Sequence, residues 1–268
     1  MLYLVGTPIG NMEDITLRGL ATLKKADVIA CEDTRHSAPF LNRYEVHAPL
    51  ISYHKFNERE QTPRILELLK EGKEVALITD AGMPCISDPG AVLVKAARAE
   101  GLDVCVVPGA TAAVSALCLS GVSTGYVFLG FLPDKRKDAE EALAPFTRSP
   151  LPLVFYCGCH DLAKYAEWLY ELLGDRPLTV VKEITKLHEA VEETTLAAGF
   201  TGDTRGEFVL IVGGFEAKEN WDTLTVEEHL SAYLKLGLDK KEAVKRVAAE
   251  RKVKKDEIYK VAIKMGEE

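Results

Sequence analysis

Over its first 120 residues the sequence alternates short apolar runs with longer amphipathic segments. The apolar runs lie at residues 2–5, 28–31, 50–52, 75–79 and 104–107. Between and after these runs, the spacing of apolar residues predicts helices at 16–25, 35–42, 60–71, 89–100 and 111–120. Strands that alternate with helices of this length are typical of a mainly parallel sheet that helices cover on both faces.

The alternation starts again after residues 121–125. Further apolar runs predict strands at 127–131, 153–156, 179–182 and 208–212. A helix is predicted at 161–173, with Asp161 as its N-cap and Gly174 just beyond its end. Residues 190–196 are ambiguous between helix and strand, and we favour a strand. A second α/β domain, again with a mainly parallel sheet, is therefore expected.

The sequence changes character after about residue 219. Three short helices are predicted, at 225–236, 239–250 and 256–265. The whole chain has 33 basic against 41 acidic residues and a net charge of −8. Residues 235–264, however, hold 11 basic and 5 acidic residues, a charge of +6 that leaves −14 for the rest. We therefore predict α/β domains at 1–120 and 121–218, followed by a basic helical module at 219–268.

The charge distribution limits the partners that the chain could bind. A chain this acidic is not a general polyanion binder, so any contact with nucleic acid must be local. The basic module is the candidate for such a contact, because lysines and arginines neutralise phosphates. The alternative is that these side chains only solvate the outer faces of the helices.

One uncharged stretch, residues 104–133, is long enough to span a membrane. Glycines and a Pro-Gly pair interrupt it, so we read it as strand, loop, helix and strand, and we expect no membrane association. The six cysteines are scattered and include no Cys-x-x-Cys pair, and the N-terminal residues do not resemble an export signal. We therefore expect the reducing cytoplasm.

Three loops rich in glycine, proline and small residues follow predicted strands, at 6–11, 80–90 and 108–112. Ligands of open α/β sheets sit beyond the carboxyl ends of the strands, so these loops are candidates for a binding site. The first loop is not a phosphate loop, because it has no Gly-Lys-Ser/Thr and Pro8 removes an amide donor. It also has no Gly-x-Gly-x-x-Gly pattern, which disfavours a nicotinamide-dependent dehydrogenase.

The order and sequence of these loops resemble the tetrapyrrole methylase family. The similarity covers almost the whole chain. Its motifs are Gly-Thr-Pro-Ile-Gly-Asn at 6–11, Cys-Glu-Asp-Thr-Arg at 31–35, Tyr-His-Lys-Phe-Asn-Glu at 53–58, the loop at 80–90, Pro-Gly-Ala-Thr-Ala at 108–112, Phe-Leu-Gly-Phe-Leu-Pro at 128–133, Lys-Glu-Ile-Thr-Lys at 182–186 and Gly-Glu-Phe-Val-Leu-Ile-Val-Gly at 206–213. The resemblance is closest to the branch that methylates the ribose 2'-oxygen of a cytidine in 16S ribosomal RNA, in the decoding region of the small subunit.

The resemblance implies a fold with two α/β domains, a helix-turn-helix-like C-terminal module and S-adenosylmethionine as the cofactor. It also implies a homodimer. Pro8 and Gly10 would line the cofactor site from the first loop. Asp80, Gly82 and Met83 would contact the ribose and methionine parts of the cofactor. Ala110, Thr111 and Ala112 would pack near its sulfonium and carboxylate. Tyr156, Cys157 and Phe208 would enclose its adenine.

The second domain departs from the RNA-modifying branch. Where that branch usually has Tyr-Glu-x-Pro-His-Arg, this chain has Tyr-Cys-Gly-Cys-His-Asp at 156–161, which is more like the porphyrin-modifying relatives. A corrin or porphyrin C-methyltransferase and a non-catalytic RNA-binding relative therefore stay open as alternatives. The two cysteines and the histidine of this segment lack the spacing of a metal site, so we expect no metal.

Polar residues after the second and third strands are candidates for the acceptor side. Methyl transfer to a ribose hydroxyl needs a base or a charge-stabilising group near that hydroxyl. Glu32, Asp33 and Arg35 follow one strand, and His54 follows the next; of these we select Asp33, Arg35 and His54 as catalytic candidates. Asp33 could instead cap the next helix with Arg35 paired to it, and His54 could be an ordinary surface histidine. Lys186 is a candidate contact to RNA phosphate or a solvated lysine.

Overall fold

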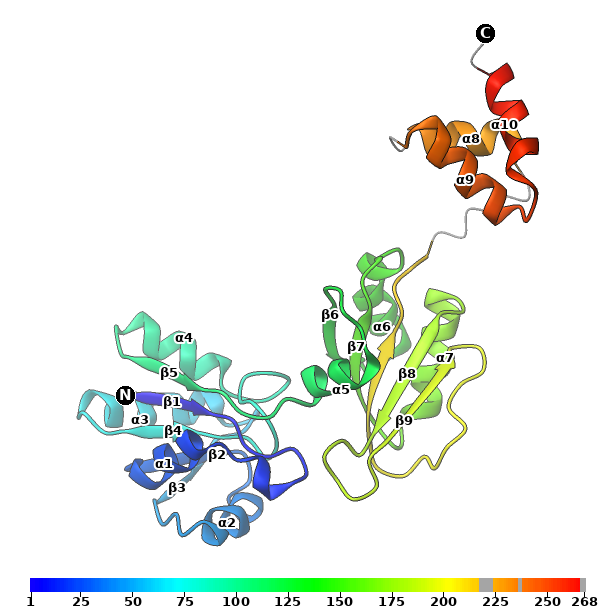
Figure 1. Ribbon diagram of the computed structural model, residues 1–268. Helices are drawn as coiled ribbons and strands as arrows, with labels where there is room; N and C mark the ends of the chain where they lie inside the picture. Colours follow the sequence, from blue (N-terminus) through cyan, green and yellow to red (C-terminus); the bar gives the residue numbers. More distant parts are fainter. Residues whose placement is uncertain (217–223, 236–237, 266–268) are drawn as a thin grey trace. The chain divides into compact units, whose positions relative to one another are not determined.

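The computed structural model describes residues 1–216, 224–235 and 238–265. The chain divides into two compact units, Met1–Phe215 and Glu216–Glu268 (Figure 1). The first unit contains two five-stranded sheets, and the second contains helices alone among its described residues.

The first sheet is entirely parallel and has the strand order β3-β2-β4-β1-β5. Its strands are β1 (Leu2–Val5), β2 (Val28–Cys31), β3 (Leu50–Ser52), β4 (Val75–Leu77) and β5 (Val104–Val107). The helices that follow them are α1 (Leu17–Lys25), α2 (Thr34–Arg43), α3 (Glu58–Lys70), α4 (Ala91–Ala99) and α5 (Ala112–Ser120), with a short 3-10 turn, η1 (Met12–Asp14), after the first loop. The predicted α/β class and the parallel pairing of this sheet are confirmed.

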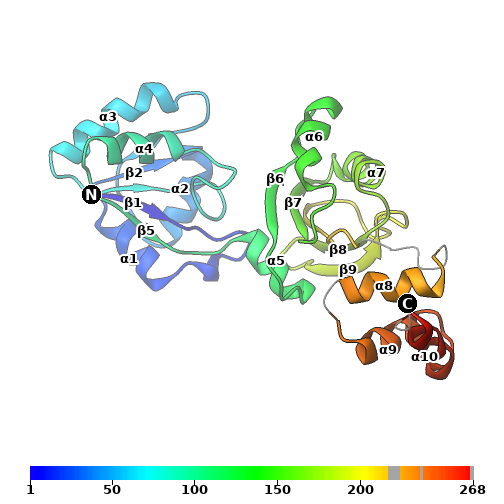
Figure 2. The same ribbon diagram turned by 90° about the horizontal axis from the view of Figure 1, so that it is seen from above.

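Successive side chains of a strand point to opposite faces of a sheet, and here both faces are buried. On one face Ala30 packs with residues of α3 and α4 such as Ile65 and Leu93. On the other face Ile29 packs with residues of α1 and α2 such as Leu23. Figure 2 shows α3 and α4 on one side of this sheet and α1 on the other. The carboxyl ends of the strands are left free for ligand-binding loops.

The second sheet has the order β6-β7-β10-β8-β9. Its strands are β6 (Val127–Phe131), β7 (Leu153–Gly158), β8 (Pro177–Lys182), β9 (Ala190–Thr195) and β10 (Glu207–Val212). Only β6 and β7 pair in parallel, whereas the other three pairs are antiparallel. The predicted mainly parallel sheet is therefore wrong for this half. A short connection between β8 and β9 makes them a hairpin, which forces antiparallel pairing. The strand predicted at 190–196 is confirmed as β9.

Helices cover both faces of the second sheet. On one face lie α6 (Arg136–Leu143), the 3-10 turn η2 (Ala144–Phe146) and α7 (Leu162–Leu173). On the other face α5 packs, through Ala116 and Leu117, against residues of β7, β8 and β10 (Figure 2). The helix that follows β5 in the chain thus covers the second sheet. The boundary at 120/121 stays a prediction.

Several local predictions can be compared directly with the structure. Helix α6 was not predicted at all. Asp161 is the N-cap residue of α7, as predicted, but its side chain makes no capping hydrogen bond and pairs instead with Lys164 at 2.6 Å. Residues 104–133 form β5, α5 and β6. Within the described part of the chain, every helix is too short or too polar to cross a membrane.

The second unit is a three-helix bundle with its own core. Its helices are α8 (Val226–Lys235), α9 (Lys240–Glu250) and α10 (Lys255–Lys264). Leu230, Val247 and Ile258, one from each helix, are all at least 98% buried and pack together. The side chain of Asp239 caps α9 by accepting a hydrogen bond from the amide of Glu242 at 2.8 Å. The three predicted helices are confirmed, although residue 236, the predicted end of the first, lies outside the described residues.

Candidate functional site

The three predicted loops meet at the carboxyl edge of the first sheet because β1 lies between β4 and β5. Thr7 and Gly82 exchange backbone hydrogen bonds of 2.9 and 3.2 Å, which join the first loop to the second. The first and third loops touch backbone to backbone: a Cβ on Gly6 would lie 2.7 Å from the Cα of Gly109. Only glycine allows two backbone segments to approach this closely.

A cavity of about 510 Å³ lies against the second and third loops. We call it the larger cavity. Eight of the residues predicted to bind the cofactor line it: Asp80, Gly82, Met83, Thr111, Ala112, Tyr156, Cys157 and Phe208. The structure thus brings residues of both sheets together at one place. Phe128, Phe131 and Ile184 are among the further lining residues that belong to the quoted motifs but were given no role.

The walls of the larger cavity combine apolar surface with a few polar groups. Phe128 and Phe131 both contact the ring of Tyr156 edge-on, with centroids 5.0 and 5.5 Å apart. The hydroxyl of Tyr156 accepts a hydrogen bond from the amide of Ala113 at 3.4 Å. One carboxylate oxygen of Asp80, Oδ1, is buried and has no hydrogen-bond partner among the described residues. Because buried polar atoms are normally paired, this oxygen is available to a ligand.

A second cavity, of about 470 Å³, lies against the first loop and the start of α2. We call it the smaller cavity. Pro8 and Gly10 line this cavity and not the larger one, and so does Arg35. Ala110 lines neither cavity and packs, partly buried, beside Ile9. The two cavities share five lining residues, Ile9, Asp80, Ala81, Lys186 and Glu207.

The junction of the two cavities is built by the turn after β8. The ammonium group of Lys186 pairs with the carboxylates of Glu183 at 2.9 Å and Glu207 at 2.7 Å. The hydroxyl oxygen of Thr185 accepts a hydrogen bond from the amide of Asn11 at 3.2 Å, which joins this turn to the first loop. A Cβ on Gly10 would lie 2.5 Å from the side chain of Lys186. The turn therefore fits closely against the first loop.

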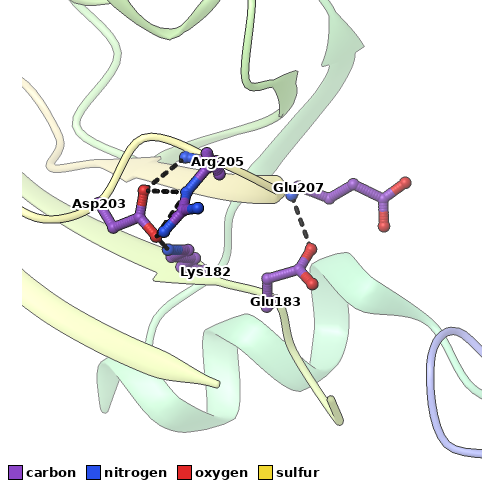
Figure 3. Close-up of polar contacts among 5 residues, drawn as sticks. All are labelled: Lys182, Glu183, Asp203, Arg205 and Glu207. Carbon is purple, nitrogen blue, oxygen red and sulfur yellow. Dashed lines mark hydrogen bonds and ion pairs between the residues drawn. The ribbon is translucent and has the colours of Figure 1, made fainter. Parts of the chain in front are cut away.

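A network of charges holds the base of this turn (Figure 3). Glu183 accepts a hydrogen bond from the amide of Glu207 at 2.8 Å, and its hydrogen bond with Lys186 is the main reason that its pKa is lowered. The largely buried Lys182 pairs with Asp203 at 3.1 Å, and Asp203 also binds Arg205. These contacts fix the backbone from which Lys186 projects.

Comparison with known proteins agrees with this arrangement. The sequence model of the Tetrapyrrole (Corrin/Porphyrin) Methylases matches residues 1–198. The chain belongs to this family. It is 41% identical to "Ribosomal RNA small subunit methyltransferase I" of Bacillus subtilis, over 97% of this chain and 92% of that protein. It is 37% identical to the protein of the same name from Synechocystis, over 99% and 98%.

A solved structure shares the fold. Uroporphyrin-III C-methyl transferase from Thermus thermophilus, complexed with S-adenyl homocysteine, superposes with a TM-score of 0.56 at 24% identity, over 79% of this chain and 96% of that one. The predicted tetrapyrrole methylase-like fold is therefore confirmed.

The predicted catalytic residues of this tetrapyrrole methylase have different surroundings. Asp33 is the N-cap of α2: it accepts a hydrogen bond from the amide of Arg35 at 2.8 Å and pairs with the Arg35 guanidinium at 2.9 Å. Hydrogen bonds from Arg35 lower the pKa of Asp33 to about 2. Arg35 lines the smaller cavity, whereas Asp33 and His54 line neither cavity. His54 lies in a tight turn and accepts a hydrogen bond from the amide of Phe56 at 3.3 Å.

Sequence reasoning gave no role to Asp88, which lines the larger cavity. Burial, and secondarily the nearby carboxylates of Glu32 and Asp80, raise the pKa of Asp88 to about 6. Burial and Asp80 also raise the pKa of Glu32. The signal that could have indicated this cluster is the position of all three acids just after strands of one parallel sheet, or in the loops that follow them.

The cysteines and possible metal ligands complete the site. Cys157 is buried in the wall of the larger cavity, and burial raises the pKa of its thiol to about 12, so it is a neutral thiol at physiological pH. All six cysteines are free thiols. Within the described ranges, no three His, Cys, Asp or Glu side chains gather in a way that could hold a metal ion.

Proposed function

We propose that this tetrapyrrole methylase uses S-adenosylmethionine to methylate the ribose 2'-oxygen of a cytidine in 16S ribosomal RNA, in the decoding region of the small subunit. The observation that carries the proposal is the similarity, at 37 to 41% identity over nearly the whole chain, to proteins named as small-subunit ribosomal RNA methyltransferases. We place this activity in the cytoplasm and assign it to a homodimer.

The larger cavity fits the cofactor. Its volume of about 510 Å³ lies within the range of small-molecule sites, which bury most of their ligand. The aromatic wall around Tyr156, with Phe208, suits the adenine ring, and the unpaired oxygen of Asp80 suits a hydroxyl or ammonium donor. Gly82 and Met83, with Thr111 and Ala112 opposite, supply backbone and small side chains against the rest of the ligand. When bound, S-adenosylmethionine supplies an electrophilic methyl group.

The protein has to hold the acceptor oxygen about 3 Å from that methyl group and keep water out. Pro8 and Gly10, which line the smaller cavity, belong in our proposal to the acceptor side of the site rather than to the cofactor side. Arg35 is exposed at the same cavity and is the contact that we assign to RNA. Asp33 then acts as a positioning residue, because it holds the Arg35 guanidinium.

The second unit is proposed to dock on the RNA-rich particle. Of its basic residues in the 235–264 window, nine are exposed: Lys240, Lys241, Lys245, Arg246, Lys252, Lys254, Lys255, Lys260 and Lys264. Arg251 has a structural role instead, since it donates hydrogen bonds to the carbonyl oxygens of Leu224 and Thr225 and to Nδ1 of His229. Exposed cations of this kind give affinity for phosphates without reading a sequence.

A corrin or porphyrin C-methyltransferase is the second candidate, and the Tyr-Cys-Gly run at 156–158 favours it. One experiment distinguishes the two candidate functions. The protein is incubated with methyl-labelled S-adenosylmethionine and either unmodified small subunits or uroporphyrinogen. We expect label at the 2'-oxygen of one cytidine of 16S RNA. Label on the macrocycle alone would establish the second candidate, and label on neither, with S-adenosylmethionine still bound, would leave a non-catalytic RNA-binding protein.

A further inference from the structure

The smaller cavity is a separate compartment with its own walls. It is formed by the first loop, the start of α2 and the strand end at Ile78, and it meets the larger cavity only at their five shared residues. Phe40 and Ile78, at least nine-tenths buried, supply apolar surface. Its volume of about 470 Å³ is again that of a small-molecule site. A cofactor that fills the larger cavity leaves this space for a second ligand.

Ser37 is the buried polar group of this cavity. It lies on α2, is 97% buried and lines the cavity, and its hydroxyl has the thiol of Cys31 as a weak hydrogen-bond partner. At the junction, Oδ1 of Asp80 has no hydrogen-bond partner among the described residues. A buried polar atom without a partner destabilises the free protein unless a ligand or water binds it. Asp80 is assigned to the cofactor above. A thiol is a weak acceptor, so the Ser37 hydroxyl keeps hydrogen-bonding capacity for a second ligand in this cavity.

The charges around the cavity indicate what part of a ligand enters it. Two cations, Arg35 and Lys186, line it together with two carboxylates, Asp80 and Glu207. Inside the cavity the ammonium group of Lys186 is already paired with the carboxylates of Glu183 and Glu207, so the interior suits a neutral group and not a phosphate. The Arg35 side chain is 90% exposed, which places a cation where a phosphate outside the cavity can reach it.

We propose that the smaller cavity receives the acceptor nucleoside, turned out of its RNA strand. Its ribose would lie at the junction with the larger cavity and its base against Ser37 and Phe40. This inference rests on the proposed function. Enzymes that do chemistry on a base commonly turn the nucleotide out of its stack into a pocket, and the same movement would bring a ribose to the junction. The Ser37 hydroxyl can then bind the base edge.

Two substitutions test the proposal, with one matched control. Pro39→Trp places a large side chain on the wall of the smaller cavity, and Ser37→Ala removes only the hydroxyl that we assign to the base edge. Pro63→Trp makes the same change at an exposed proline inside α3, which lines neither cavity. The readouts are kcat and KM for unmodified small subunits, and the affinity for S-adenosylmethionine measured by calorimetry in the same preparations.

We expect Pro39→Trp to lower kcat/KM for small subunits about 100-fold, because the acceptor is displaced by roughly an ångström or more. Ser37→Ala should lower it about three- to tenfold, the effect of one hydrogen bond, mostly through KM. Both variants should bind S-adenosylmethionine within about twofold of the wild type, and Pro63→Trp should match the wild type throughout. An unchanged kcat/KM in both cavity variants would overturn the proposal, and so would a loss confined to S-adenosylmethionine binding.

The same experiments distinguish an error in this proposal from an error in the proposed function on which it rests. If the wild type does not methylate small subunits at all, the proposed function is wrong. If the wild type methylates them and both cavity variants do so equally well, the nucleoside lies elsewhere and only the present inference is wrong.

Discussion

The close approach of the first and third loops makes a quantitative prediction for Gly6→Ala. The new Cβ would lie 2.6 Å from Sδ of Met83 and 2.7 Å from the N and Cα of Gly109, whereas ordinary contacts begin at 3.4 Å. The methionine can move, but Gly109 is backbone. The two loops must therefore separate by about 0.7 Å, against the hydrogen bond from the Gly6 amide to the Val107 carbonyl oxygen at 3.0 Å.

Overpacking of this kind costs about 1–3 kcal/mol. We expect the upper half of that range, because backbone cannot rotate away as a side chain does. A loss of about 2–3 kcal/mol corresponds to a fall in Tm of roughly 4–12 °C for a domain of this size. Because Met83 lines the larger cavity, affinity for S-adenosylmethionine should fall as well, by about tenfold for each 1.4 kcal/mol of misfit.

The measurements are differential scanning calorimetry and titration calorimetry with S-adenosylmethionine. The control is Gly125→Ala, whose Cβ would make an ordinary contact of 3.6 Å with Leu151 and which should behave as the wild type. If Gly6→Ala melts and binds the cofactor as Gly125→Ala does, the loops are not held in the tight contact described above.

Three further predictions concern the acidic cluster, a buried cation and the second unit. Burial raises the pKa of Asp88 from 3.8 to about 6, so the folded protein holds this proton more tightly than the unfolded chain does, and the wild type loses stability as the pH rises from about 4 to about 6. In urea denaturation Asp88→Asn should therefore gain stability relative to the wild type over that interval. The gain should be about 1–2 kcal/mol, discounted because the carboxyl is partly exposed, and a flat difference would contradict this. Arg176, 96% buried, donates hydrogen bonds to the carbonyl oxygens of Leu173 and Thr147, so Arg176→Leu leaves these carbonyl groups unpaired and should lower the free energy of unfolding by about 2–4 kcal/mol. Arg205→Leu, at an exposed ion pair, should lower it by less than about 1 kcal/mol, and equal losses would refute the distinction. A chain that ends at Phe215 should keep its affinity for S-adenosylmethionine. It should bind small subunits more weakly, and its binding should depend less on salt concentration. Unchanged binding to small subunits would exclude the second unit as a docking module.

The first sheet could be predicted from the sequence almost residue by residue. The bounds of β1, β2, β3 and β5 agree with the predicted runs because each run is short, apolar and ended by turn residues or charges. Burial on both faces produces such runs in a parallel sheet. The positions of the three loops followed from the same pattern, since loops after parallel strands lie on one edge.

The second sheet could not be predicted equally well. Residues of β7 and β10 are buried on both faces, so their sequences read like parallel strands although they pair with each other antiparallel. Strand direction depends on the connections between strands, which apolar runs do not encode. Helix α6 was missed because only Ala139 and Leu143 are buried in it, too weak a pattern to stand out among charged residues.

The division of the site into two cavities was also beyond sequence reasoning. It depends on contacts between residues far apart in the chain, such as Gly10 with Lys186 and Asn11 with Thr185. Pro8 and Gly10 were therefore grouped with the cofactor residues, although they line the other compartment. The alternative reading of Asp33 as a helix cap could be settled only by its geometry.

Backbone strain is concentrated in the loops around the two cavities. Among the described residues, six non-glycine residues have φ in the left-handed region, and four of them lie in two loops: Cys85 and Ser87 before α4, and Glu183 and Thr185 after β8. Glycine would adopt these angles without strain. Side-chain contacts explain why two of these positions are not glycine: Thr185 binds the amide of Asn11, and Glu183 binds Lys186 and the amide of Glu207.

The side-chain contacts of Glu183 and Thr185 thus account for the strained backbone of the turn after β8. Replacing Thr185 or Glu183 by glycine would relieve the backbone strain, but it would release the first loop or the ammonium group at the junction. Strain of about 1–3 kcal/mol at each such residue persists only where surrounding contacts outweigh it. In this fold those contacts join the second sheet to the first loop, at the point where the two cavities meet.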